Sequence, residues 1–379
     1  MEISALDLLN LIKTQKVNLI DVRSEGEFLK GSIPGAINSP ILNDDHRHQV
    51  GLCYKLFGQD KAIECGHRLV DPIKAQLLEE WSRIAESGPV YVHCWRGGLR
   101  SNFAAEWMRE IGIEAITVSK GYKEIRALLV SKLNPVLNSV LDINPNSNQE
   151  PNFVSESRTH FFILAGLTGT GKTKLLNSLP KKNQIDLEHL ANHRGSAFGS
   201  NSSSDDSSTY NTQPTQQNFE NALGLELYFH PDPFVIEDES RSIGKLQLTK
   251  EFYELMQTQP IILQEVSLED RVLNILNEYI LDSKKESQAL NADLLNSLTR
   301  IQKRLGGSMF KSISEIMKEA FEQKSNDRHR DWISMLLKSY YDLFYQSRLD
   351  KSKDQIIFSG STKEVYEFII DRTGRGRTR

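Results

Sequence analysis

The segment GLTGTGKT, residues 166–173, constrains the possible folds of this 379-residue chain more strongly than any other feature. It fits the pattern G-x-x-x-x-G-K-[S/T], follows the apolar run FFILA and precedes the helix-like run KLLNSL. Strand, glycine loop and helix in this order form a loop whose backbone amides wrap a phosphate. The lysine is expected at the terminal phosphate oxygens and the threonine at a magnesium ion. The predicted phosphate-binding residues are Gly166, Gly169, Gly171, Lys172 and Thr173.

The sequence indicates the phosphate loop clearly but says less about which ligand the loop binds. The segment IEDES, residues 236–240, ends another predicted core strand with three consecutive acids. Asp238 or Glu239 could hold magnesium or its water ligands, or the acids could simply cap the strand. The glycines suit a diphosphate and do not tell whether a nucleotide or another molecule carries it.

A second loop is built around Cys94 in the segment VYVHCWRGGLRS, residues 90–101. The cysteine ends an apolar strand and precedes a turn that opens a helix, and both the turn amides and the helix N-terminus lower a thiol pKa. Adjacent glycines let the backbone curl around one point, and two arginines can balance the charge of an anion there. A buried, inert cysteine is the alternative. The predicted anion loop comprises Trp95, Arg96, Gly97, Gly98, Leu99 and Arg100.

Strand-like and helical runs alternate along the chain, which indicates an α/β fold with two parallel sheets. We expect a first domain over residues 1–138, with strands at 17–24, 35–40, 89–94 and 114–121. Residues 139–158 are rich in Asn, Pro and Ser, which predicts a linker. The second domain covers 159–379, with strands at 159–166, 233–240, 260–267 and 354–360 and a helical, basic part over about 268–350. Inside it, the low-complexity stretch 199–217 is expected to be a surface insertion.

Composition excludes several classes of protein. No apolar run approaches the roughly 18 residues of a membrane helix, and the amino terminus lacks a signal-peptide pattern, so a cytoplasmic location without membrane contact is expected. Three cysteines, Cys53, Cys65 and Cys94, are an odd number that argues against a disulfide framework. Although the net charge is −4, residues 284–379 hold 19 Lys and Arg against 13 Asp and Glu. A polyanion is an admissible partner for this part, and a solvated helical surface is the alternative.

The segments IDVRSEGEF (20–28) and KGSIPGAINSP (30–40), followed by the cysteine loop, resemble the rhodanese domain. In that family a loop cysteine carries sulfur as a persulfide. From Cys94 to Arg100 the loop has the form C-x5-R, one residue longer than in common single-domain sulfurtransferases and equal to the loop of rhodanese-fold phosphatases. One interpretation is therefore a rhodanese-type sulfurtransferase or a cysteine-dependent phosphatase fused to a nucleotide-binding module.

The order of the motifs along the chain resembles the tRNA 2-selenouridine synthase family. The resemblance rests on the two loops and on the segments NDDHRHQVGLCYK (43–55), DLEHLANHRGSAFG (186–199), NFEN (218–221), IEDESRSIG (236–244) and RLGG (304–307). It implies an enzyme that alkylates wobble 2-thiouridine of tRNA with geranyl diphosphate and then replaces the geranylated sulfur with selenium from selenophosphate. No bound organic cofactor is implied, and Mg²⁺ is a candidate ion.

Carried to this sequence, the resemblance makes Cys94 the catalytic thiol and its loop the seat of selenophosphate. The phosphate loop would take geranyl diphosphate, with Asp238, Glu239 and Arg241 in the diphosphate or magnesium neighbourhood. The basic carboxyl-terminal third would bind the tRNA anticodon, and the aromatics of SYYDLFYQSR (339–348) would stack on a splayed base. Packing of these aromatics into the core is the alternative.

Overall fold

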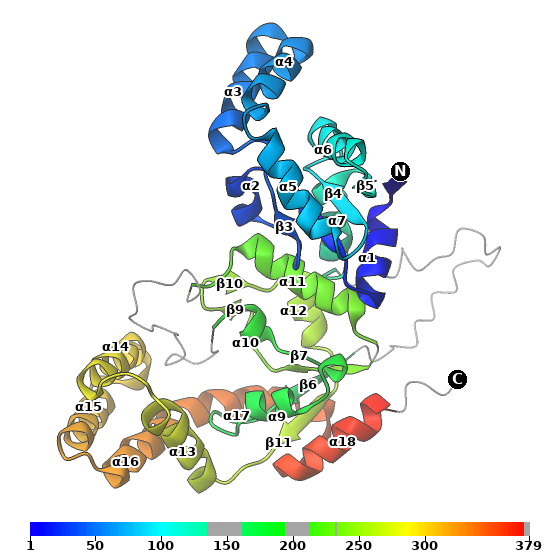
Figure 1. Cartoon of the computed structure of the whole chain (residues 1–379). Coiled ribbons are helices and arrows are strands. Elements are labelled where there is room, and N and C mark those ends of the chain that lie inside the picture. The colour runs from blue at the N-terminus through cyan, green and yellow to red at the C-terminus, as the bar shows by residue number, and fades with distance from the viewer. Residues whose placement is uncertain (135–160, 194–211, 232, 375–379) are drawn as a thin grey trace. The chain divides into compact units, whose positions relative to one another are not determined.

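Figure 1 shows the computed structural model of the chain, which describes residues 1–134, 161–193, 212–231 and 233–374. These residues form two units. Unit 1 comprises the described residues of Met1–Asn144 together with Pro214–Phe229, and unit 2 comprises those of Pro145–Gln213 and His230–Arg379. The predicted linker at 139–158 and residues 199–211 of the predicted insertion lie outside the described residues. No helix in the described ranges has the length and apolar character needed to cross a bilayer.

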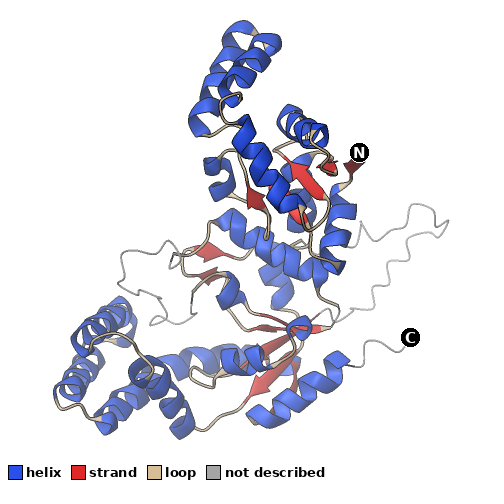
Figure 2. Ribbon diagram, in the orientation of Figure 1, coloured by secondary structure: helices blue, strands red, loops and turns tan. Residues whose placement is uncertain are grey.

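Unit 1 is built on a parallel sheet, which has five strands among the described residues, in the order β1-β5-β4-β2-β3. Figure 2 shows the helices (blue) and strands (red) of the chain. Its central strands are short and buried, as expected for a sheet covered on both faces. The strands are β1 (Glu2–Ile3), β2 (Asn18–Asp21), β3 (Ile37–Asn38), β4 (Val90–His93) and β5 (Ala115–Val118).

Helices cover both faces of this sheet. Trp81 and Met108 belong to one apolar core, and Leu8 and Ile125 belong to the other. A hairpin of α3 and α4 extends the first core through Val70. The helices are α1 (Ala5–Thr14), α2 (Glu25–Lys30), α3 (Asp44–Phe57), α4 (Gln59–Val70), α5 (Lys74–Ala85), α6 (Leu99–Glu110), α7 (Gly121–Ser131) and α11 (Gln216–Phe229).

Helix α11 belongs to unit 1 although it follows part of unit 2 in the sequence. Asn221, the last residue of the NFEN segment, donates from Nδ2 to the hydroxyl of Tyr122 on α7 over 3.0 Å. Gly224 lies so close to α7 that a Cβ there would be 2.4 Å from the carbonyl oxygen of Leu129. The chain therefore leaves unit 1, returns for this one helix and leaves again.

Unit 2 contains a second parallel sheet, with the order β12-β11-β6-β8-β7 in the described part of the chain. Its central strand, β6, precedes the phosphate loop, and an antiparallel pair, β9 and β10, lies outside the sheet. The strands are β6 (Phe161–Ala165), β7 (Gln184–Ile185), β8 (Phe234–Glu237), β9 (Ser242–Ile243), β10 (Leu246–Gln247), β11 (Ile261–Gln264) and β12 (Ile356–Gly360).

Two groups of helices complete unit 2. Helices α9 and α18 share an apolar core with the sheet, through Leu176 and Ile369. A helical part, from α13 to the π-helical turn η4, has its own core around Leu298, Met317 and Trp332. The elements are α9 (Lys172–Ser178), η1 (Lys181–Asn183), α10 (Leu187–Leu190), α12 (Lys250–Met256), α13 (Leu268–Leu276), η3 (Asn277–Leu281), α14 (Ser287–Leu305), α15 (Gly307–Glu322), α16 (Asn326–Leu336), η4 (Leu337–Tyr341), α17 (Asp342–Lys351), η5 (Lys353–Gln355) and α18 (Thr362–Gly374).

The predicted α/β class with two parallel sheets is confirmed. Each of the eight predicted strands is present in shortened form, as β2, β3, β4, β5, β6, β8, β11 and β12. The prediction missed β1, β7, β9 and β10, because two residues are too few to show a period of alternation.

Candidate functional site

Cys94 follows β4 directly, and α6 begins five residues later. Its Sγ accepts a hydrogen bond from the backbone N–H of Gly98 (3.3 Å) and lies 3.3 Å from the hydroxyl of Ser101. Burial opposes ionisation of this thiol, but the contacts with Ser101, the charge of Arg100 and the Gly98 N–H together lower the pKa of Cys94. The predicted thiolate site is thus assembled from the strand end, the turn and the first helical turn.

The loop from Cys94 to Arg100, here called the thiol loop, is held by close backbone packing. Gly97 has a φ of +65°, and a Cβ there would lie 2.7 Å from the carbonyl oxygen of Val118. Gly121, with a φ of +57°, packs under the loop, where a Cβ would be 2.3 Å from the carbonyl oxygen of Cys94. The backbone N–H of Tyr122 donates to that same carbonyl over 2.9 Å. The sequence prediction missed Gly121, which it assigned to the end of a strand.

We expect Gly121→Ala to destabilise unit 1 more than the substitution Gly112→Ala does. Both glycines have positive φ, +57° and +86°, but a Cβ at Gly112 meets nothing within 4 Å. Gly112→Ala should therefore lower the free energy of unfolding only by the strain of a left-handed backbone, about 1 kcal/mol. Gly121→Ala should lower it by about 3 kcal/mol, because a steric clash is added to that strain. Urea unfolding of both variants measures the difference, and equal losses would contradict the clash.

The two arginines of the thiol loop have different surroundings. Arg100 is partly buried, and its Nη1 donates to Glu27 on α2 over 2.6 Å. Arg96 is exposed, and so is Trp95, whose ring centroid lies 5.4 Å from that of Tyr122. Sequence reasoning gave no role to Glu27, because the contact spans 73 residues and no local pattern marks it.

The phosphate loop, Gly166–Thr173, connects β6 to α9. Gly169 and Gly171 have positive φ values of +85° and +78°, as a loop that turns its amides inward requires. Helix α13 holds the loop from outside: buried Arg271 donates to the carbonyl of Thr168 (2.8 Å), and Asn274 donates to that of Gly169 (2.9 Å). The helical part therefore fixes the shape of the phosphate loop.

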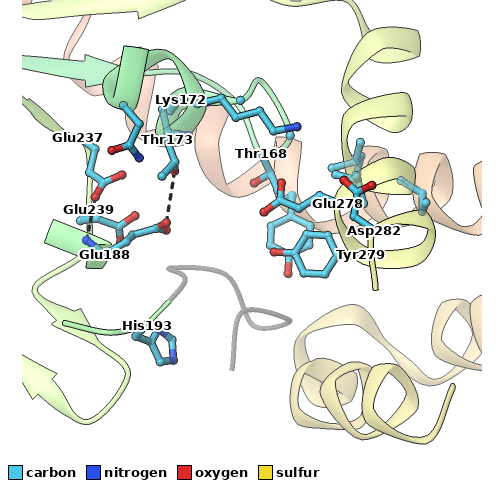
Figure 3. Close-up of a pocket in the computed structure, with 18 of the residues that line it drawn as sticks. Thr168, Lys172, Thr173, Glu188, His193, Glu237, Glu239, Glu278, Tyr279 and Asp282 are labelled. Carbon is cyan, nitrogen blue, oxygen red and sulfur yellow. Dashed lines mark hydrogen bonds between the residues drawn. The ribbon is translucent and has the colours of Figure 1, made fainter. Parts of the chain in front are cut away.

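A cavity of about 760 Å³ opens beside this loop, and Figure 3 shows residues that line it. On one side it is lined by the loop residues Lys172 and Thr173. The ammonium group of Lys172 donates to the carbonyl of Gly166 (2.7 Å) and lies 5.2 Å from the ring centroid of Tyr345. Burial opposes the charge, but the electrostatic effect of Tyr345 and of nearby acids raises the pKa of Lys172. Lys172 is therefore a buried cation at the edge of the cavity.

The opposite wall of this cavity comes from the helical part of unit 2 and from α17, and it is mixed. Glu278, Tyr279 and Asp282 add polar groups to it (Figure 3), beside apolar and aromatic side chains. Buried Trp332 and Leu336 contribute from α16, with Tyr341 and Tyr345 beside them. The remaining apolar residues of the wall are Ile275, Leu294, Ile333 and Leu337. A ligand here would meet both charge and hydrocarbon.

Three carboxylates gather below α9 (Figure 3). One oxygen from each of Glu188, Glu237 and Glu239 lies within 4.8 Å of the others, and the hydroxyl of Thr173 donates to Glu188 over 3.3 Å. Burial first, and then repulsion from Glu188, raise the pKa of Glu239 to about 7. Burial and neighbouring acids raise the pKa of Glu237 well above its usual value. Such crowding suits a divalent cation, since the ion would compensate the negative charge.

Of the acids predicted from IEDES, only Glu239 joins this cluster. The side chain of Asp238 instead forms a 2.6 Å ion pair with Arg348 of α17. Arg241 is exposed, and its Nε donates to the carbonyl of Leu248 over 3.4 Å. Strand alternation explains the outcome, because neighbouring residues at a strand end point to opposite sides, so Glu237 and Glu239 share a direction that Asp238 does not.

The aromatic run at 339–348 has a mixed environment. Tyr340 packs into the core of the helical part, and Phe344 is 56% exposed. Tyr341 and Tyr345 line the phosphate-loop cavity. Neither stacking on a base nor core packing therefore applies to the whole run.

Comparison with known proteins covers nearly the whole chain. A family model described as the tRNA 2-selenouridine synthase AAA domain matches residues 159–375, and one described as a rhodanese-like domain matches residues 4–128. The chain is 38% identical to the tRNA 2-selenouridine synthase of Marinobacter nauticus over 97% of each chain. It is 36% identical to the protein of the same name from Pseudomonas fluorescens, over 93% of this chain and 94% of that one.

Among solved structures, the N-terminal domain of a putative ATP/GTP binding protein from Clostridium difficile 630 covers 34% of this chain and 97% of that chain, with 28% identity and a TM-score of 0.32. The relatives found by sequence cover a far larger share of this chain than that structure does. The two family models match the chain in the order in which its two sheets occur. They decide between the interpretations that the thiol loop alone leaves open. The chain belongs to the tRNA 2-selenouridine synthase family.

Proposed function

We propose that this enzyme acts in the cytoplasm on wobble 2-thiouridine of tRNA, converting it to 2-selenouridine through an S-geranyl intermediate. The observation that carries the proposal is the cavity of unit 2, where the phosphate loop faces apolar and aromatic side chains, with Glu278 and Asp282 among them. A diphosphate with a hydrocarbon tail matches both halves of such a cavity.

In the first step the C2 sulfur of the nucleoside attacks C1 of geranyl diphosphate. The C–S bond forms, the C–O bond breaks with its electron pair leaving on diphosphate, and the proton of N3 is lost. Negative charge develops on the leaving group, where the loop amides and Lys172 stabilise it. Thr173, Glu188, Glu237 and Glu239 would hold Mg²⁺, which supplies further positive charge at the diphosphate.

In the second step the thiol loop binds selenophosphate. The thiolate of Cys94 attacks phosphorus, so that an S–P bond forms and hydrogen selenide leaves. The selenide adds to C2 and expels the geranylated sulfur as geranyl thiol, with the proton returning to N3. Water then hydrolyses the S–P bond and releases phosphate, which restores the thiol. The lowered pKa of Cys94 and the C-x5-R length of the loop support this role.

The tRNA backbone would bind to basic residues of the helical part. Arg300, Lys303 and Arg304 are exposed along the last turns of α14. Arg328 of the same part pairs with Glu319 over 3.7 Å. We place the RNA contact on α14, where lysine and arginine would neutralise phosphates.

Mass spectrometry of nucleosides tests the proposal on an anticodon stem–loop that contains 2-thiouridine. With geranyl diphosphate alone we expect S-geranyl-2-thiouridine, and with selenophosphate added we expect 2-selenouridine and geranyl thiol. Equal selenouridine formation without geranyl diphosphate would rule out the intermediate. An unchanged nucleoside with both co-substrates would rule out the assigned substrate.

A further inference from the structure

Unit 1 contains a second cavity, of about 510 Å³, that the proposed chemistry has not yet used. It lies between the α3–α4 hairpin and α6, and its lining includes Val50, Ala62, Val70, Phe103 and Trp107. The volume falls within the range of about 300–1,000 Å³ that small-molecule sites occupy. The lining is predominantly apolar, so the cavity suits a hydrocarbon.

This cavity is continuous with the thiol loop. Leu99 and Arg100, the last two residues of that loop, both line it. The polar end of the cavity carries two guanidinium groups, because Arg47 lines it as well. Glu27 connects these two groups, with 2.6 Å to Arg100 and 3.7 Å to Arg47. An occupant would thus have its apolar part among the helices and its polar end at the loop.

The proposed second step needs such a place. When C2 of the alkylated nucleoside reaches the thiol loop, the sulfur on C2 still carries a ten-carbon chain. Leaving that chain in water is unfavourable, whereas burying it beside the loop would orient the C–S bond that has to break. We propose that the cavity between α3, α4 and α6 binds the geranyl chain of the S-geranyl nucleoside during selenium transfer. The inference rests on the proposed function.

Gly66 of α4 provides a way to fill the cavity without touching the thiol loop. It lines the cavity, and a Cβ there would meet only Cγ2 of Val50, at the ordinary contact distance of 3.9 Å. Gly66→Phe places a ring in the space, and Gly66→Leu is a smaller filling variant in case the first unfolds. Glu64→Phe is the matched control, because Glu64 is exposed on the same helix and does not line the cavity.

The experiment follows only the second step, on stem–loops that already carry S-geranyl- or S-methyl-2-thiouridine, with selenophosphate. We expect Gly66→Phe to lower the ratio of kcat/KM for the geranyl over the methyl substrate at least tenfold, and Gly66→Leu to lower it less. Glu64→Phe should leave the ratio as in the wild type. An unchanged ratio in a folded Gly66→Phe enzyme overturns the inference while the proposed function stands.

A binding measurement separates the inference from failure of the proposed function. The S-geranyl-2-thiouridine nucleoside is titrated into the full-length enzyme by calorimetry, with S-methyl-2-thiouridine as reference. Preferred binding of the geranyl compound that is lost in Gly66→Phe and kept in Glu64→Phe supports the cavity assignment, even if no selenium is transferred. Because the unit 2 cavity can also bind a geranyl chain, the stoichiometry is compared as well: an unchanged affinity and number of sites in both filling variants overturns the inference.

Discussion

Replacement of Lys172 by alanine should lower the rate of S-geranylation by about 10³-fold, equivalent to roughly 4 kcal/mol of transition-state stabilisation. The reason is that the ammonium group lies in the phosphate-loop cavity beside the loop carbonyl of Gly166, where the diphosphate would leave. Initial rates of S-geranyl-2-thiouridine formation measure the effect.

Two controls accompany this variant. Lys182→Ala removes an exposed lysine outside the cavity lining and should leave the rate unchanged. Lys172→Ala should still convert a preformed S-geranyl substrate, because that step uses the thiol loop of unit 1. Loss of both steps with unchanged thermal stability would show that the two loops do not divide the reaction as proposed.

Replacement of Cys94 by serine should abolish selenium transfer, with a loss of at least about 10⁴-fold. A serine hydroxyl does not ionise near neutral pH, so the environment that lowers the pKa of the thiol offers it no comparable activation. Geranylation should continue, and S-geranyl-2-thiouridine should accumulate when both co-substrates are present. Quantification of the three nucleosides over time measures both effects.

The control for this variant is Cys53→Ser, which changes a cysteine outside the thiol loop and should leave both products unchanged. In the wild type, rapid quenching should reveal a phosphoryl group on Cys94. A wild-type rate of selenium transfer in Cys94→Ser would overturn the assignment of the thiol.

The sequence predicts those parts of the sites that are local in the chain. Within each loop the predicted residues lie a few positions apart, Cys94 beside Gly97 and Gly98 and Lys172 beside Gly171, so strand, turn and helix signals suffice to find the loops. Ser101, which contacts the thiol, was not predicted. The direction of successive side chains at the end of β8 is also a local property, yet the prediction placed Asp238 and Glu239 in the same site. Alternation along the extended chain separates them, and it brings Glu237 to Glu239 instead.

Contacts between segments that are distant in the chain could not be predicted from the sequence. The pair of Arg100 with Glu27, and the support of the phosphate loop by Arg271 and Asn274, join residues separated by 73 to 105 positions. Each depends on how elements pack, and a single sequence contains no pattern for such pairs. The return of α11 to unit 1 belongs to the same class, although the two asparagines of NFEN were visible as a motif.

The path of α11 has a consequence for the growing chain on the ribosome. Helix α7 ends at Ser131, and α11, which packs against it, ends at Phe229, about 100 residues later. At synthesis rates of about 5–20 residues per second, the apolar face of α7 remains exposed for roughly 5–20 s before α11 has been synthesised and can bury it. Meanwhile β6 emerges, but its neighbours β8 and β11 are synthesised later still. The described strands of the first sheet are all synthesised by Val118, but α11, which completes its core, follows β6. The nascent enzyme therefore exposes two incomplete cores at once, and we expect it to need chaperones more than two successive domains would.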